Sequence, residues 1–155
     1  MAGVDVTNEG SDQAQMSPML DQLEDRYDHV PDEYLIDGGF AAIPEIEKAA
    51  KRGATVFAPV RKPRDPARDR YEPRPGDSKE TADWRERMGT ATAKAIYRDR
   101  AASVECVNAH VRNRGLQQFM VRGLEKVRAV LLWQALAQNL MRANSLGSVV
   151  ATAAA

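Results

Sequence analysis

The sequence predicts an α/β fold that continues into a helical C-terminal part. Short apolar segments suited to strands alternate with amphipathic helical segments through the first 60 residues, and this alternation is typical of a sheet with crossover helices. A proline-rich, basic segment then interrupts the pattern. Beyond it, apolar residues recur at helical spacing. The 155 residues are enough for one domain with a real core.

The first two elements are predicted to be a strand and a helix. The strand covers residues 2–7, AGVDVT. The helix has Ser17 as its N-cap and Pro18 as its first residue, because these types are favoured there, and we expect it to end near Pro31. Its apolar stripe consists of Met19, Leu20, Leu23 and Tyr27.

A second strand and helix are predicted around Asp37. Tyr34, Leu35 and Ile36 fit a buried strand, whereas aspartate is among the types least favoured inside one. Asp37 is therefore expected at the end of the strand. The next helix opens at Pro44 and stops at Gly53, and ATVFAP then forms another buried strand. The inward residues of this helix are Ile46, Ala49 and Ala50.

Residues 60–80, VRKPRDPARDRYEPRPGDSKE, hold four prolines and seven Lys or Arg without a hydrophobic period. We interpret this segment as an exposed basic loop that a partner orders, with a solvated linker as the alternative. Asp77 together with Glu80 is predicted to cap a short helix through WRERM, which Gly89 ends.

Two longer helices are predicted next. The first runs from about Thr92 to Arg114 and stops at Gly115. The second, residues 124–143, is apolar around much of its girth and is expected to be buried, with Trp133 in the core. Residues 145–155 lack helix-face patterning and are predicted to form a disordered tail. The core-facing stripe of the first of these helices is Ile96, Val104, Val107 and Val111.

Composition excludes several classes of site and location. The single Cys106 rules out an internal disulfide, and with two isolated histidines it offers no zinc pattern. The opening residues lack the basic and apolar regions of a signal peptide. The longest apolar stretch is far shorter than the roughly 20 residues that cross a bilayer. We therefore expect a cytoplasmic protein without a membrane partner.

Charge is strongly segregated although the net charge is zero. Residues 1–50 carry 12 Asp and Glu against 2 Lys and Arg, while the remaining residues carry 10 against 20. This segregation suggests an acidic centre beside a surface that attracts a polyanion, although solvated faces alone also produce it.

Asp37 and Glu105 are the carboxylates best placed for chemistry. Two glycines follow Asp37 and let the backbone turn sharply, and ligands of open α/β sheets bind at that end of the strands. Glu105 lies at the edge of the apolar stripe of its helix, with Arg98 and Arg112 seven residues to either side. That pattern is also typical of a surface salt-bridge ladder. Brought together, the two carboxylates would suit Mg²⁺ or Mn²⁺.

Several stretches resemble the C-terminal half of a DDE transposase from bacterial insertion sequences. They are YLIDGGF, the basic insertion with GDSKETADWRERM, and IYRDRAASVECVNAHVRNRGLQQFMVRGLEKVRAVLLWQALAQNLMR. The resemblance implies that residues 1–144 form a partial, N-terminally truncated ribonuclease-H-like catalytic domain, with a mixed sheet and packed helices. It also implies metal-dependent cleavage and strand transfer at the ends of the element, with Asp37 as the second catalytic aspartate and Glu105 as the catalytic glutamate.

The chain departs from the family pattern around the glutamate. Tyr97 and Arg100 match the family's tyrosine and arginine in type, but each lies one residue farther from Glu105 than in the strictest pattern. Arg112 occupies the position of the family's lysine. Contact with a DNA phosphate is the role that the resemblance implies for such cations.

A larger departure is that the family's first aspartate would lie upstream of Met1. We expect neither Asp5 nor Asp12 to replace it. Cleavage of a phosphodiester is well served by two metal ions roughly 3.5–4 Å apart, and Asp37 with Glu105 would hold only one ion well. The chain is therefore expected to lack full strand-transfer activity.

The predicted contacts with double-stranded DNA come mainly from cations, which bind the phosphate backbone without reading sequence. Trp84 is a candidate for stacking on a distorted DNA end, with a core position as its alternative. The full set of predicted DNA contacts is Arg61, Lys62, Arg64, Arg68, Arg70, Arg74, Trp84, Tyr97, Arg100, Arg112 and Arg114.

Two other functions are open on the sequence alone. A non-catalytic DNA-binding remnant would bind DNA in a salt-sensitive manner without cutting it. A nucleotide-binding α/β protein would use the DGG turn for phosphate, but GGFAAI lacks the G-x-G-x-x-G spacing. The resemblance further implies a homodimer working on paired DNA ends.

Overall fold

The computed structural model describes residues 1–113 and 115–153, and the side chains of residues 101–108 and 148–153 lie outside this description. The chain divides into two compact units. One unit comprises residues 9–108, and the other combines residues 1–8 with residues 109–155. Within the described part, no helix is both long and apolar enough to cross a membrane.

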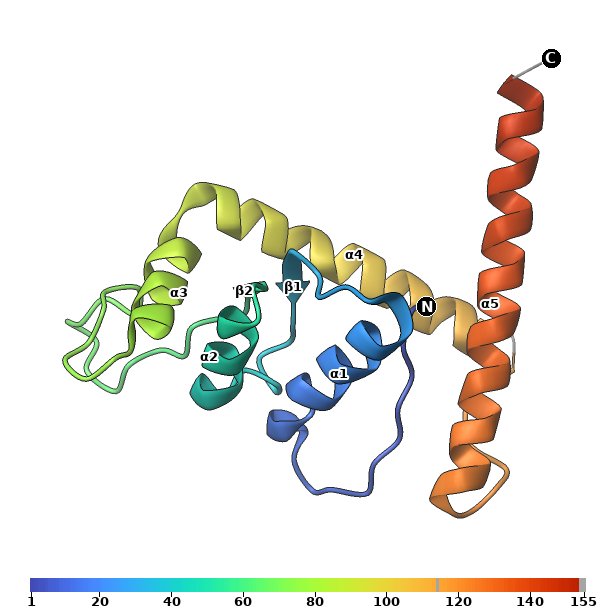
Figure 1. Ribbon diagram of the computed structural model, residues 1–155, viewed down its shortest axis with the longest axis horizontal. Helices are drawn as coiled ribbons and strands as arrows, with labels where there is room; N and C mark the ends of the chain where they lie inside the picture. Colours follow the sequence, from blue (N-terminus) through green and yellow to red (C-terminus); the bar gives the residue numbers. More distant parts are fainter. Residues whose placement is uncertain (114, 154–155) are drawn as a thin grey trace. The chain divides into compact units, whose positions relative to one another are not determined.

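The unit of residues 9–108 contains a small parallel sheet (Figure 1). Strand β1 (Glu33–Leu35) pairs with strand β2 (Thr55–Phe57), and Glu33 lies opposite Thr55. Helix α2 (Ile43–Lys51) connects the two strands. The predicted strand, helix, strand alternation is confirmed for these elements, and the fold is mixed α/β.

Further helices pack in the same unit. A short 3₁₀ turn, η1 (Asp12–Ala14), leads into helix α1 (Met16–Tyr27), and helix α3 (Lys79–Gly89) leads into helix α4 (Ala91–Asn113). Helix α2 contacts both α1 and α3. The buried core includes Met16, Leu20, Ile36, Ile46, Val56, Phe57, Trp84 and Met88.

The start of helix α1 differs from the prediction. The helix begins at Met16, so Ser17 and Pro18 lie in its first turn and not at its N-cap. The backbone N–H and the hydroxyl of Ser17 both donate to a carboxylate oxygen of Glu45, at 3.0 and 2.5 Å. Glu45 of α2 thus satisfies a donor that a local cap would otherwise serve. Tyr27 ends the helix, and at 57% exposure it is not part of the core stripe.

The predicted strand at residues 2–7 is wrong, because this segment is irregular and belongs to the other unit. A strand needs a hydrogen-bonded neighbour, and among the described residues β1 and β2 pair only with each other. The amino group of Met1 instead donates to the side-chain oxygen of Asn139, whose amide donates back to the Met1 carbonyl oxygen at 2.8 Å.

Helix α3 is capped by Ser78, and not by the predicted pair of Asp77 and Glu80. The Ser78 hydroxyl oxygen accepts from the N–H of Thr81 at 3.2 Å, and the hydroxyl donates to Glu47 at 2.6 Å. Helix α2, through Glu47, therefore helps to orient the Ser78 side chain. Local sequence patterns do not reveal such a contact between distant residues.

The predicted ends of the next helices are close to the observed ones. Helix α3 ends at Gly89, as predicted. Helix α4 runs from Ala91 to Asn113, within one residue of the prediction at each end. Gly115 follows with a φ of 94°, a left-handed conformation that glycine adopts without strain.

Helix α5 (Leu124–Ala153) lies in the other unit and is less buried than predicted. Among its described side chains Ala135 is buried, whereas Trp133 is 71% and Leu140 is 63% exposed. The prediction of Trp133 as a core residue is wrong, because the less exposed side chains of α5 lie on another face, which includes Leu131, Ala135 and Gln138. The helix also continues through residues 145–153, where the sequence predicts a disordered tail.

Glu45 couples the stability of the fold to acid pH. Its side chain is 9% exposed and pairs with Lys48 at 2.7 Å. Burial by itself would raise the pKa of Glu45, but hydrogen bonds from Lys48 and Ser17 hold it below its usual value of 4.5. Because the folded pKa is the lower one, the stabilisation is present above about pH 4.5 and is lost as pH falls through the folded pKa.

We expect Glu45→Gln to lower the free energy of unfolding at pH 7 by about 1–3 kcal/mol and to flatten its decline in acid. Urea denaturation followed by circular dichroism at neutral and acid pH measures both effects. Glu86→Gln is the matched control, because Glu86 is exposed on helix α3. An unchanged acid decline in Glu45→Gln would show that another group governs it.

Candidate functional site

Asp37 lies two residues beyond the end of strand β1, close to the predicted position at the strand's end. The N–H of Ile36 still donates to the carbonyl oxygen of Phe57 at 3.0 Å, so the ladder ends immediately before Asp37. The Asp37 carboxylate accepts the N–H of Gly38 at 2.6 Å, and its side chain is 63% exposed. A Cβ atom on Gly38 would lie 3.1 Å from Cγ of Pro59, so the close passage of the chain favours glycine. The turn holds this carboxylate and leaves it accessible.

Tyr97 and Arg100 of helix α4 lie beside Asp37. The Arg100 Nη2 atom is 3.6 Å from Asp37 Oδ1, and the Arg100 guanidinium is 5.2 Å from the centre of the Tyr97 ring. Burial raises the pKa of Tyr97 above 10.0 despite the nearby Arg100, and Asp37 raises it further. The Tyr97 hydroxyl is therefore a protonated donor at neutral pH. We call these three residues the Asp37 cluster.

The other predicted site residues in and just after helix α4 are Glu105, Arg112 and Arg114. Glu105 belongs to helix α4, but its side chain lies outside the described residues, as does Arg114. Arg112 is exposed. Across residues 1–113 and 115–153, apart from the undescribed side chains, no group of three or more His, Cys, Asp or Glu could hold a metal ion.

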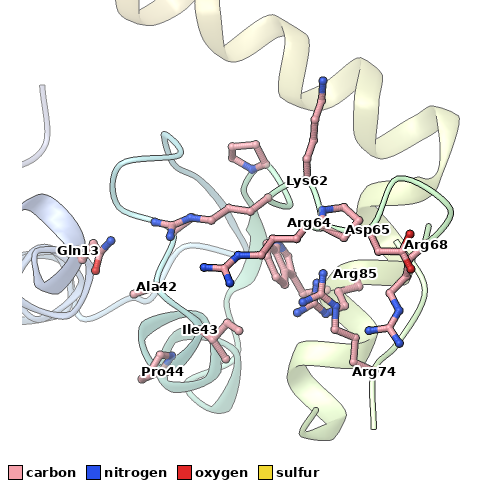
Figure 2. A pocket seen from close by; sticks show the side chains of 15 residues that line it. Gln13, Ala42, Ile43, Pro44, Lys62, Arg64, Asp65, Arg68, Arg74 and Arg85 are labelled. Atoms are coloured by element: carbon pink, nitrogen blue, oxygen red, sulfur yellow. The ribbon is translucent and has the colours of Figure 1, made fainter. Parts of the chain in front are cut away.

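The basic loop folds around a pocket of about 730 Å³ in the unit of residues 9–108, which we call the basic pocket (Figure 2). Figure 2 shows Arg68, Arg74 and Arg85 gathered on one side of it, facing the N-terminal end of α2 at Ala42 and Ile43. The loop consists of bends and turns, and its cations are exposed at residues 61, 62, 64 and 68, in line with the predicted exposed basic loop. The charged residues that line the pocket are Arg61, Lys62, Arg64, Asp65, Arg68, Arg74 and Arg85.

Sequence patterns did not single out Arg85, which lines the basic pocket from helix α3. Its side chain is 4% exposed, and its Nε–H donates to Asp77 Oδ2 at 2.7 Å. The same carboxylate oxygen accepts the backbone N–H of Arg74 at 2.9 Å. The only signal in the sequence is the spacing of eight residues between Asp77 and Arg85. Such spacing is too common to identify a buried ion pair.

Two predicted DNA contacts are placed differently from the others. Trp84 is only 4% exposed, and its indole N–H donates to the carbonyl oxygen of Ala58 at 3.2 Å. Its ring is therefore a core group, which is the alternative that the sequence left open, and Trp84 also lines the basic pocket. Arg70 does not line the basic pocket, and its guanidinium lies 5.4 Å from the centre of the Tyr71 ring.

Comparison with known families decides the classification. A family model described as a transposase DDE domain matches residues 61–143, which is more than half of the chain. The chain belongs to the DDE transposase family. A search of curated proteins and a search of solved structures find no significant match.

The matched part of this DDE transposase domain includes the basic loop, helices α3 and α4 and most of α5. Glu105 and Arg100 lie inside it, whereas Asp37 precedes it. Membership supports transposition and DNA recombination as the general activity, with DNA as the substrate. It gives no support to the nucleotide-binding interpretation of the DGG turn.

Proposed function

We propose that this chain carries part of the ribonuclease-H-like catalytic domain of an insertion-sequence transposase acting in the cytoplasm. In this proposal Asp37 and Glu105 hold Mg²⁺ or Mn²⁺ for cleavage of double-stranded DNA and strand transfer at the ends of the element. The Asp37 cluster is the supporting observation, because it brings a strand-end carboxylate beside helix α4. Glu105 belongs to the same helix, and its approach to Asp37 is part of the proposal.

The Asp37 carboxylate has the donor chemistry that a hard divalent cation needs. An exposed carboxylate at the end of a strand offers the oxygen ligands that Mg²⁺ and Mn²⁺ prefer. When bound, such an ion stabilises the charge that develops on a phosphodiester under attack. Arg100 would contact a phosphate held at Asp37 through charge-assisted hydrogen bonds. The protonated Tyr97 hydroxyl adds a neutral donor beside it.

The proposal includes an incomplete set of ligands. The two-metal reaction needs ions roughly 3.5–4 Å apart, and two carboxylates hold one of them well. No residue of this sequence matches the first aspartate of the family pattern. We therefore propose that a segment upstream of Met1 supplies it, and that this chain alone binds DNA and metal without completing strand transfer.

The basic pocket favours a second candidate function, that of a non-catalytic DNA-binding remnant. Six of the predicted DNA contacts, five cations and Trp84, line this pocket, and none of them belongs to the Asp37 cluster. A protein that used only these cations would occupy DNA without cutting it. Its binding would weaken steeply with salt, because each phosphate neutralised releases counterions.

Nicking of supercoiled plasmid and DNA binding, measured on the same preparations, separate the two functions. The comparison uses this chain and a version extended by the reading frame upstream of the Met1 codon. We expect the extended version to nick DNA only with Mg²⁺ or Mn²⁺, and Asp37→Ala or Glu105→Ala to remove the nicking. Salt-sensitive binding without nicking in either version would identify the remnant and contradict the catalytic proposal.

A homodimer on paired DNA ends is also part of the proposal, and the exposed face of helix α5 supports it. Trp133, Leu136 and Leu140 are 71%, 47% and 63% exposed at helical spacing, and residues 129–141 carry no charge. In the unit of residues 9–108, the exposed large hydrophobic residues are Tyr27 and Ile43 alone among those described. A second copy of α5 therefore suits this face best, and light scattering of the purified chain tests it.

A further inference from the structure

The basic pocket is a built cavity that the metal proposal does not use. Asp37, Tyr97 and Arg100 are not among the residues that line it. Its volume of about 730 Å³ falls within the roughly 300–1,000 Å³ of pockets that enclose small ligands. A second binding function is therefore available within the same unit.

Two arginines form an organised inner wall. Asp77 Oδ2 accepts the side chain of Arg85 at 2.7 Å and the backbone N–H of Arg74 at 2.9 Å, so one carboxylate positions both residues. The Arg85 guanidinium also lies 5.6 Å from the centre of the Trp84 ring. That ring is itself positioned by the hydrogen bond that its indole N–H donates to the carbonyl oxygen of Ala58. These contacts fix the wall before any ligand arrives.

The Nε–H group of Arg74 lacks an acceptor in this wall. The Nε atom is buried, and within the described part of the chain it has no hydrogen-bond partner. Buried guanidinium N–H groups are normally paired, since leaving one unsatisfied costs its hydration. Arg74 also lines the basic pocket, so a small shift of its guanidinium toward an anion bound there would give this donor an acceptor.

The charge of the pocket selects the kind of acceptor. Arg61, Lys62, Arg64 and Arg68 add cations to its lining, while Asp65 is its single acid among the described residues. Arginine forks match the geometry of phosphate oxygens, and the N-terminal end of α2 adds a favourable dipole for an anion. A neutral ligand would leave these charges without a counterpart.

We propose that the basic pocket is a phosphate-binding site, in which Arg74 and Arg85 form the inner wall and the cations of residues 61–68 form the mouth. Its ligand is a phosphate group of a nucleic acid, held apart from the Asp37 cluster and without a metal ion. That DNA supplies this phosphate rests on the proposed function. The pocket itself requires only phosphate chemistry.

The arginine Nε–H NMR signals of the whole chain test the proposal directly. Inorganic phosphate, ATP and a short 5′-phosphorylated DNA duplex are titrated separately, each with a chelator present. We expect a saturable shift of the Arg74 Nε–H signal with the duplex that a chelator does not remove. A response to ATP stronger than to the duplex would make a free nucleotide the ligand and overturn the DNA source, and no Arg74 response to any probe would overturn the site.

Two variants that each remove one positive charge distinguish binding in the basic pocket from general electrostatic attraction of DNA. Arg74→Gln keeps the backbone N–H that binds Asp77, and Arg70→Gln removes a cation that does not line the basic pocket. We expect Arg74→Gln to weaken duplex binding by at least about tenfold and Arg70→Gln by much less. Arg64→Gln at the mouth is the second test if Arg74→Gln fails to fold.

The outcomes distinguish this site from the proposed function. Equal losses in Arg74→Gln and Arg70→Gln would overturn the pocket, even where metal-dependent nicking is found. Phosphate binding at Arg74 without nicking in any version would uphold the pocket and overturn the catalytic proposal.

Discussion

Asp37→Asn is expected to abolish metal-dependent DNA cleavage in the version of the domain that carries its upstream segment, and to weaken Mn²⁺ binding by this chain. Residues that merely orient a metal ligand cost roughly 10–100-fold in affinity or activity when removed, so a direct ligand should cost at least about 100-fold. Asparagine preserves the shape of the turn, because its carbonyl oxygen can still accept the N–H of Gly38. The change therefore tests the charge of the carboxylate.

Electron paramagnetic resonance of bound Mn²⁺ and plasmid nicking provide the two measurements. Asp25→Asn is the matched control, because Asp25 is an exposed acid on helix α1. We expect the control to bind Mn²⁺ as the unchanged chain does. If Asp37→Asn also keeps its Mn²⁺ affinity and its nicking, the assignment of Asp37 as a metal ligand is wrong.

Trp84→Ala is expected to cost about 3–5 kcal/mol of the free energy of unfolding, which is a large part of the stability of a small domain. The indole fills the core between helix α3 and the chain after β2, and only 4% of the residue is exposed. Removing it leaves a cavity and also strips the Ala58 carbonyl oxygen of its donor. Trp84→Phe should lose less, since it retains most of the packing and gives up mainly the hydrogen bond.

Urea denaturation monitored by circular dichroism measures these losses. The second tryptophan supplies the control, because Trp133 is 71% exposed on helix α5. At protein concentrations where light scattering shows a monomer, we expect Trp133→Ala to change stability by less than about 0.5 kcal/mol. At higher concentrations the proposed dimer would cover Trp133, so the cost of Trp133→Ala should grow with protein concentration while that of Trp84→Ala should not. A small cost at Trp84 would contradict its role in the core.

Local sequence patterns predicted the elements that depend on near neighbours. Strand β1 ends at Leu35, two residues before Asp37, helix α2 contains Pro44 in its first turn, and helix α3 ends at Gly89. Each of these rests on backbone preferences of a few adjacent residues. The strand predicted at residues 2–7 failed for the complementary reason, because a strand depends on a partner segment that local sequence does not report.

The candidate site likewise combines residues that the sequence indicates with contacts that only the folded chain shows. Asp37 could be singled out as a strand-end acid, and the cations of the loop could be counted. The contact of Asp37 with Arg100 joins positions 63 residues apart, and no local spacing encodes it. The roles of Trp84 and Arg85 are likewise decided by contacts with Ala58 and Asp77.

The sequence by itself determined the family, the alternation of β1, α2 and β2, and the acid that follows β1, because composition, periodicity and turn residues act over short distances. The tertiary structure alone decided that Glu45 serves the start of helix α1, that Trp84 belongs to the core and that the basic loop encloses a pocket. Burial and hydrogen-bond partners depend on which distant segments meet, and that is a property of the folded chain.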